Sequence, residues 1–200
     1  APDGRGAYYA CKTGALADRV CMAATRADED RTGPPLDPLS ELQAIAVSPD
    51  GARMAWLSRD LDDRISLKVA DWSNGRATSA ARTLWSDDLL DVSGYALGET
   101  RPVRWTSYDG MAFEGLLTLP PGYKGGPLPL LVDIHGGSNG GVSLDGSMLN
   151  ATPLERQVWA GMGYAHFSAD YRAGFIVDRT IEVFRNAPGM TIYEDNARDV

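Results

Sequence analysis

Long apolar runs are missing from this sequence of 200 residues. A membrane-spanning helix needs roughly 18 or more consecutive apolar residues, and the longest apolar stretch, residues 128–134, is interrupted by Pro129 and Asp133. Positive charge is also scarce, because 19 Lys and Arg residues are outnumbered by 27 Asp and Glu residues, which gives a net charge of −8. The sequence therefore predicts no membrane span and no nucleic-acid partner.

Cysteine and histidine are rare, with two residues of each. No Cys/His spacing suits zinc, and no Gly-rich loop opens a helix with a lysine, so we expect no metal, nucleotide or other cofactor. Cys11 and Cys21 flank a Gly-containing segment and could face each other across a hairpin. A disulfide would indicate a periplasmic or secreted protein, whereas free thiols fit the cytoplasm, and the sequence leaves this choice open.

The two ends of the sequence lack the signals of a complete protein. It starts at Ala1 without a signal peptide. It stops at residues 196–200, which have the pattern of an opening helix without a stop signal. We therefore interpret the sequence as an internal piece of a longer chain.

The first half has the pattern of short, evenly spaced β-strands. Residues 42–47 and 52–57 are apolar runs joined by residues 48–51, Ser-Pro-Asp-Gly. In that turn Pro49 presets φ and Gly51 accepts a positive φ. These residues predict a β-hairpin.

A second hairpin is predicted immediately afterwards. Residues 65–71 alternate apolar and polar side chains, Asn74-Gly75 forms the turn, and residues 80–85 return. Two hairpins in this order predict a four-stranded antiparallel sheet, the size of one propeller blade, with an antiparallel sandwich as the alternative. Residues 22–40 are acidic, contain three prolines and predict a long loop.

The pattern changes near residue 100. Residues 103–107 and 112–119 predict another hairpin around a turn at residues 108–110. Residues 128–134 are mostly apolar without alternation, which is typical of a strand covered on both faces.

A helix and a further strand follow that apolar strand. Thr152-Pro-Leu-Glu155 is a capping box with proline at the first helical position, and Gly163 marks the stop. The predicted apolar face of this helix comprises Leu154, Val158, Trp159 and Met162. Residues 164–171 are the next strand. Strand, helix and strand at this length form a parallel crossover, so the second half predicts an α/β sheet.

Several sequence pieces occur in the order found in the prolyl oligopeptidase family of serine peptidases, and together they resemble its dipeptidyl-aminopeptidase and acylaminoacyl-peptidase branches. The pieces are residues 48–51, 105–123, 130–137, 156–172 and 194–200. The resemblance implies β-propeller blades in residues 1–99, the C-terminal part of a propeller domain, and the N-terminal part of an α/β-hydrolase catalytic domain in residues 100–200. It departs from the family pattern at Ser138 and Ala173.

The resemblance also implies a function. The whole protein would be a serine peptidase that hydrolyses short peptides through an acyl-enzyme, with its catalytic triad absent from this chain. The turn at His135, Gly136 and Gly137 would contribute a backbone N–H to the oxyanion hole. A plain tight turn remains the alternative for the two glycines, and the His135 imidazole is expected to hold the loop by hydrogen bonds.

Residues 136–140 also fit the Gly-x-Ser-x-Gly pattern of a nucleophile elbow around Ser138. An elbow needs a helix directly after the serine and a histidine base downstream. The helix begins only near residue 153, and the one later histidine, His166, lies in a predicted buried strand. We therefore do not assign Ser138 as the nucleophile, and we expect His166 to be a core histidine whose ring nitrogens are satisfied by the backbone.

Two other functions fit the same sequence. A hydrolase core does not fix the acyl group, so an esterase or other acyl hydrolase is one alternative. A non-catalytic propeller protein that acts by binding, with a degenerate hydrolase tail, is the other. Exopeptidase or endopeptidase action, the preferred residue before the cleaved bond, and the oligomeric state are left open.

Overall fold

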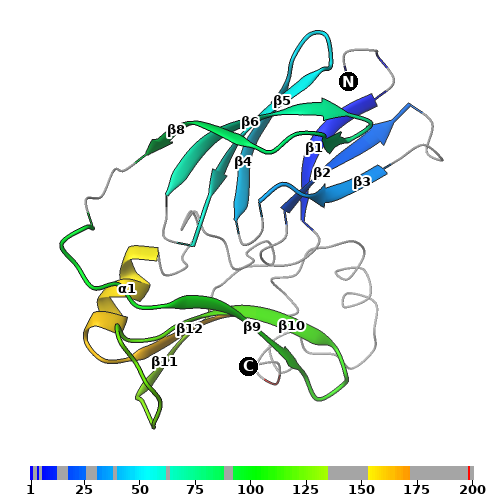
Figure 1. Ribbon diagram of the computed structural model, residues 1–200. Coiled ribbons are helices and arrows are strands. Elements are labelled where there is room, and N and C mark those ends of the chain that lie inside the picture. Colours follow the sequence, from blue (N-terminus) through cyan, green and yellow to red (C-terminus); the bar gives the residue numbers. More distant parts are fainter. Residues whose placement is uncertain are drawn as a thin grey trace. The chain divides into compact units, whose positions relative to one another are not determined.

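The computed structural model describes residues 1, 4, 6–12, 18–25, 31–37, 40–61, 64–87, 92–134, 153–171 and 198. The chain divides into two compact units, Ala1–Leu90 and Asp91–Val200. Within the described residues each unit is built mostly of β-strands (Figure 1).

The first sheet of unit 1 has three antiparallel strands in the order β1-β2-β3. Their bounds are β1 Gly6–Lys12, β2 Asp18–Ala24 and β3 Arg31–Pro35. The prediction of a loop over residues 22–40 is therefore wrong at both β2 and β3. The prolines of β3 fit because β3 is the end strand of the sheet and its register against β2 is irregular; proline lacks a backbone N–H and is tolerated at edges and bulges.

The second sheet of unit 1 contains both predicted hairpins, in the order β4-β5-β6-β7, with β8 also paired to β6. Its strands are β4 Glu41–Val47, β5 Arg53–Arg59, β6 Ile65–Ser73, β7 Arg76–Ala77 and β8 Arg82–Asp87. Asn74 and Gly75 have φ of 51° and 75°, which a tight two-residue hairpin turn requires at both positions. The returning strand is interrupted between β7 and β8, so the predicted pairing of residues 80–85 holds from Arg82 onwards.

The turn of the first hairpin is closed by its own side chains. The Ser48 Oγ hydroxyl donates to Asp50 Oδ1 at 2.6 Å, and the same carboxylate accepts the Ala52 N–H at 3.0 Å. Gly51 has a φ of 72°. The turn between β9 and β10 repeats this chemistry, because Asp109 Oδ1 accepts the Met111 N–H at 3.1 Å.

The core of unit 1 lies on one face of the second sheet. Strand alternation places Met54, Trp56 and Ala70 on this face, all of them buried, and the core is completed by Val20 and Leu42 together with Trp72. The first and second sheets of unit 1 therefore share one hydrophobic cluster.

Unit 2 contains a four-stranded sheet in the order β11-β12-β10-β9 (Figure 1). Its elements are β9 Thr100–Thr106, β10 Ala112–Thr118, β11 Leu130–Ile134, α1 Pro153–Gly161 and β12 Ala165–Asp170. β10 is antiparallel to both β9 and β12, whereas β11 and β12 are parallel, with Leu130 opposite Ala165 and Ile134 opposite Ala169. The prediction that these two strands are parallel neighbours is confirmed. No helix in the described part of the chain is long and apolar enough to cross a membrane.

Helix α1 begins at Pro153 as predicted, and its end follows a Schellman pattern. Gly163 has a φ of 91° and donates its N–H to the Ala160 carbonyl at 3.0 Å. The next N–H, of Tyr164, reaches the Trp159 carbonyl at 3.1 Å. Local sequence signals therefore fix both ends of this helix.

Three of the four residues of the predicted apolar face of α1 are exposed, and the fourth, Trp159, is partly buried and packs edge-on against Tyr164. Leu154, Val158 and Met162 are exposed to 49%, 53% and 64%, whereas Arg156 and Ala160 are buried at 1% and 0%. The sheet face that α1 covers presents the polar side chains of His166, Ser168 and Thr118 beside the apolar Leu116, all of them buried.

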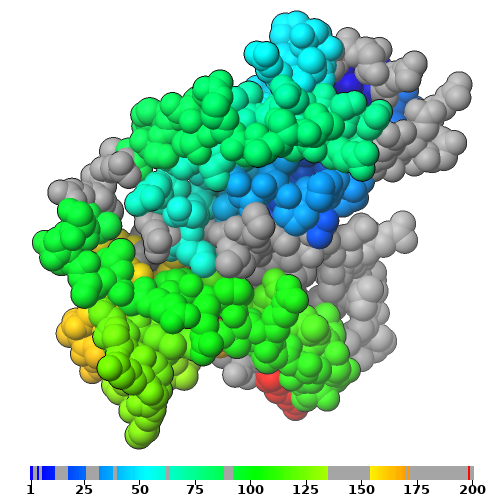
Figure 2. Space-filling model, viewed as in Figure 1, coloured from blue at the N-terminus to red at the C-terminus, as the bar shows by residue number. Residues whose placement is uncertain are grey.

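Strand β11 is also less covered than its composition predicts. Leu130, Val132 and Ile134 are exposed to 56%, 39% and 60%, so the prediction of a strand covered on both faces is wrong in this structure. β11 is the end strand of its sheet, and these three side chains lie on the face opposite to that of His166 and Ser168, which α1 covers. The segments that hold β11 and α1 both appear on the surface in Figure 2.

Candidate functional site

The parallel pair β11 and β12 defines the edge of the sheet at which chemistry is expected. Ile134 is opposite Ala169, so both strands end at the same edge. Ligands and catalytic loops of α/β folds lie at the carboxyl ends of parallel strands. His135, Gly136 and Gly137 follow β11 directly in the sequence. They lie outside the described residues, as Ser138 does, and their role stays a prediction.

A cluster of polar side chains is buried between α1 and the sheet. His166 and Ser168 lie two residues apart on β12, so they share one face of the sheet, and they are exposed to only 0% and 4%. Helix α1 covers this face, because Gln157 Nε2 donates to the Thr100 hydroxyl at 3.5 Å, and Thr100 is opposite Thr118 in the sheet. Thr118 of β10, opposite His166, is fully buried as well. Arg156 enters the same interface from α1. We call these four residues the α1 polar cluster.

His166 is buried as predicted, but the expected backbone hydrogen bonds are absent. Neither ring nitrogen of His166 has a hydrogen-bond partner in the part of the chain that the structure describes. Burial lowers the pKa of His166, the carboxylates of Asp133 and Glu155 oppose this shift, and the Arg156 guanidinium reinforces it. The ring is therefore neutral at neutral pH.

The residue types of a hydrolytic triad meet here without forming one. Asp133 on β11 is opposite Ser168 on β12, and His166 is two residues away on the same face. A triad needs a hydrogen bond from nucleophile to base. Among the described residues the Ser168 hydroxyl and the His166 ring have no hydrogen bond, and both are shielded from solvent. This arrangement has no catalytic geometry.

The other end of the α1 interface is satisfied by hydrogen bonds. The Gln157 side-chain carbonyl accepts the Gly98 N–H at 2.7 Å, and its amide donates to the Gly98 carbonyl at 3.0 Å. Thr100 and Thr118 share a hydroxyl–hydroxyl hydrogen bond of 3.0 Å. Gln157 therefore fastens α1 to the segment that precedes β9.

A carboxylate joins the loop after β3 to the second sheet of unit 1. Asp37 accepts hydrogen bonds from Trp56 Nε1 at 2.8 Å, Ser58 Oγ at 2.8 Å and Lys68 Nζ at 2.9 Å. Burial alone would raise the pKa of Asp37, but the hydrogen bonds from Trp56, Lys68 and Ser58 outweigh it and lower the pKa below 3.8. Asp37 is therefore ionised in the folded chain at neutral pH, and its hydrogen bonds stabilise that form.

A second carboxylate ties the two sheets of unit 1 together. Asp18, at the start of β2, is buried at 3% and accepts the Leu42 N–H of β4 at 2.8 Å. A buried carboxylate needs such a partner to offset its desolvation. Asp18 and Asp37 are thus structural groups, each linking segments that are far apart in the sequence.

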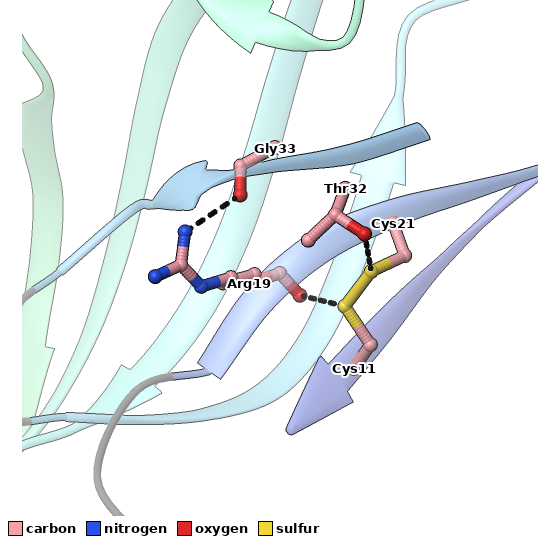
Figure 3. The surroundings of a disulfide bond; sticks show 5 residues. All are labelled: Cys11, Arg19, Cys21, Thr32 and Gly33. Carbon is pink, nitrogen blue, oxygen red and sulfur yellow. Dashed lines mark hydrogen bonds between the residues drawn. A yellow bond between two sulfur atoms is a disulfide. The ribbon is translucent and has the colours of Figure 1, made fainter. Parts of the chain in front are cut away.

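Cys11 and Cys21 form a disulfide across the β1–β2 hairpin (Figure 3). They are diagonal neighbours, since Cys11 is opposite Arg19 and Cys21 is opposite Tyr9, and their Cα atoms are 5.8 Å apart. The Arg19 Nη1 group next to them donates to the Gly33 carbonyl of β3 at 3.2 Å. The sequence left open whether Cys11 and Cys21 are bonded or free, and the structure contains the disulfide.

Two hollows lie among the described residues of unit 1. One, of about 450 Å³, lies where the partner strand of β6 is interrupted, and its charged lining is Arg53, Asp71 and Arg82. Another, of about 380 Å³, lies between β3 and the β6–β7 turn and is bordered by Tyr8 and Arg76. Across the described residues no group of three His, Cys, Asp or Glu side chains could hold a metal ion.

No protein-family model matches the chain, and no curated protein sequence does. Solved structures do match. An acylaminoacyl peptidase from Pyrococcus horikoshii aligns with 96% of this chain and 28% of its own, at 18% identity and a TM-score of 0.63. A puromycin hydrolase variant aligns with 96% of this chain and 28% of its own, at 20% identity and a TM-score of 0.61. The AtxE2 isopeptidase aligns with 90% of this chain and 25% of its own, at 16% identity and a TM-score of 0.55.

These similarities establish a fold class. The described residues share the mostly β-sheet fold of the matching part of several peptidases, and at such low identity the similarity concerns the fold alone. The chain spans only about a quarter of the length of these enzymes.

Asp37, Asp18 and Arg156 were missed by the sequence analysis. Asp37 is flanked by proline at residue 38 and has the composition of a loop, so nothing local marks it as buried. The alternation of Trp56 and Ser58 on one face of β5 was a usable signal, because both side chains carry a hydrogen-bond donor on the same face as the apolar Met54. Arg156 had no such signal.

Proposed function

We propose that the whole protein is a serine peptidase of the prolyl oligopeptidase family that hydrolyses short peptides through an acyl-enzyme. The observation that carries this proposal is the parallel β11–α1–β12 unit, which follows antiparallel sheets in the chain. The chain as a whole aligns over 96% of its length with peptidase structures. In this proposal the Ser, Asp and His of the triad lie outside residues 1–200, and this chain alone is inactive.

The proposed domains are a propeller part, residues 1–99, and the start of an α/β-hydrolase domain, residues 100–200. The second sheet of unit 1 supports the propeller, because its face away from the core is apolar as well. Leu57, Leu67 and Trp85 are cross-strand neighbours on that face, and Trp85 is half exposed. A sheet that is apolar on both faces packs between two other sheets, as the blades of a propeller do.

The second proposed domain is supported by the surfaces that unit 2 leaves uncovered. β11 has a strand partner on one side only within the described residues, and its outward Leu130, Val132 and Ile134 are exposed. Parallel sheets of α/β proteins are covered on both faces. We infer that the rest of the hydrolase sheet and its helices continue from β11 in the whole protein.

The role proposed for this chain in the reaction is electrostatic. Acyl transfer develops negative charge on the carbonyl oxygen, and a backbone N–H aimed at that oxygen is worth about 2.7–4 kcal/mol. Gly136 and Gly137 allow the backbone to approach the substrate closely. We propose that this turn supplies one donor, and that the residue after the catalytic serine supplies the second.

Substitutions in the full-length protein test the assignment of this turn. Gly137→Val adds a branched side chain beside the acyl group and is expected to lower kcat/KM for an aminoacyl chromogenic substrate by about 100-fold or more. Ser138→Ala, the matched control in the same turn, is expected to keep most of the activity. An inactive Ser138→Ala protein beside a nearly normal Gly137→Val protein would show that the turn is a nucleophile elbow.

The compartment is proposed from the disulfide. Disulfides persist in oxidising environments and are rare in the cytosol, so the Cys11–Cys21 bond favours a periplasmic or secreted protein. Preparation of the protein from its native cells with a thiol-blocking reagent tests this, because the expected result is that neither cysteine is blocked.

A further inference from the structure

Helix α1 buries a charged side chain, Arg156, in its interface with the sheet, while most of its predicted apolar face is exposed. Its outward Leu154, Val158 and Met162 are exposed, while Arg156 and Ala160 are directed to the sheet. Of the helix residues whose burial is described, only Arg156 and Ala160 are buried, and elements with few buried apolar side chains open locally at a low free-energy cost. The state of the polar groups beneath the helix then decides how firmly it is attached.

His166 is the side chain in this interface whose ordinary pKa, about 6.5, lies nearest to neutral pH. Its ring is enclosed, and neither nitrogen has a hydrogen-bond partner within the described residues. The charged groups that act on it are Glu155 and Arg156 from α1 and Asp133 from β11, while Ser168 and Thr118 contribute only hydroxyls. A proton added to the ring would be desolvated and would lie near the guanidinium of Arg156.

We propose that His166 is a pH-sensitive latch: the neutral ring keeps α1 closed on the sheet, and protonation releases the helix. The open state exposes the ring to water, where it binds a proton with an ordinary pKa of about 6.5. Burial lowers the pKa of the closed state, with Arg156 acting in the same direction against Asp133 and Glu155. The open state binds the proton more tightly than the closed state. The free energy that favours the closed state is therefore largest above about pH 6.5 and decreases as pH falls below that value.

Hydrogen exchange of the α1 amides in the full chain tests the latch. If the closed state takes up no proton, the equilibrium for opening rises by about tenfold between pH 7.5 and pH 5.5. After correction for the intrinsic exchange rate, protection of the amides from Gln157 to Tyr164 is therefore expected to fall by up to about tenfold. Unchanged protection of these amides would overturn the proposal.

His166→Gln removes the titrating group and keeps a polar side chain of similar length. We expect its α1 protection to be the same at both pH values, and a fall as large as that of the natural chain would overturn the proposal. His135→Gln, a change at the only other histidine, is the matched control and should retain the full response.

A second measurement does not depend on the folding of the His166 variant. His135 and His166 are the two histidines of residues 1–200. Each gives one Hε1 signal in the NMR spectrum of this 200-residue chain, and His135→Gln assigns them. The His166 ring is expected to titrate below the ordinary pKa of about 6.5, together with loss of α1 protection. A His166 ring that titrates at or above that value while α1 stays protected would overturn the proposal.

Discussion

Removal of the Asp37 carboxylate is expected to destabilise unit 1 by several kcal/mol. The side chain is 15% exposed and accepts three hydrogen bonds, from Trp56, Ser58 and Lys68. A hydrogen bond to a charged group contributes about 1.5–3 kcal/mol, and breaking a buried ion pair costs about 3–5 kcal/mol. Because Lys68 is 25% exposed and regains some water, we expect Asp37→Ala to cost about 3–4 kcal/mol.

The assay is urea unfolding at pH 6, with Asp71→Ala as the matched control. Asp71 pairs with Arg53 at 3.8 Å, and both side chains are more than 60% exposed, so this change is expected to stay within about 0.5 kcal/mol. The reasoning is refuted if Asp37→Ala loses less than about 1 kcal/mol, or no more than the Asp71 variant does.

The same carboxylate predicts a pH dependence. The pKa of Asp37 is lowered in the folded chain, because the hydrogen bonds from Trp56, Lys68 and Ser58 outweigh the opposing effect of burial. The unfolded chain therefore binds the proton first, so the stabilisation is complete above about pH 4 and is lost as pH falls through the lowered pKa. The stability difference between the natural chain and Asp37→Asn should shrink between pH 6 and pH 3; an unchanged difference would contradict this.

Two further predictions concern stability, each measured by urea unfolding. Replacing both Cys11 and Cys21 by serine should cost up to about 3 kcal/mol, the loop entropy of a bond that closes a short hairpin, and an unchanged midpoint would contradict the disulfide. Gly115→Ala should cost about 1–3 kcal/mol, because its Cβ would lie 2.5 Å from the Ser168 carbonyl oxygen. Gly161→Ala, whose Cβ meets nothing within 4 Å, should instead stabilise by up to about 1 kcal/mol; the same sign for both glycine variants would refute the packing argument.

Local signals in the sequence were sufficient for the elements that depend on local chemistry. The turns at Gly51 and Asn74-Gly75 and the end of α1 at Gly163 all have the backbone that their residues favour. The parallel pairing of β11 and β12 also follows from the sequence, since a helix between two strands brings them side by side in one direction.

The predictions that failed depended on the neighbours of each element. Pro34 and Pro35 suggest a loop, yet an end strand tolerates them in β3. Most of the predicted apolar face of α1 is exposed, while Arg156 is buried in the interface with the sheet that presents His166 and Ser168, and no periodicity within the helix reveals what the sheet presents. The hydrogen bonds of Asp37 likewise join residues about 19 to 31 positions apart, which no local pattern encodes.

Labelling of the full-length protein with a serine-directed fluorophosphonate, followed by peptide mapping, tests the proposed function most directly. The reagent phosphonylates a serine hydroxyl, with loss of fluoride, only where a base and an oxyanion hole activate it. We predict one labelled serine outside residues 1–200, loss of peptidase activity on labelling, and no labelling of the 200-residue chain alone. A label on Ser138, or a full-length protein that neither reacts with the reagent nor cleaves peptides, would contradict the account.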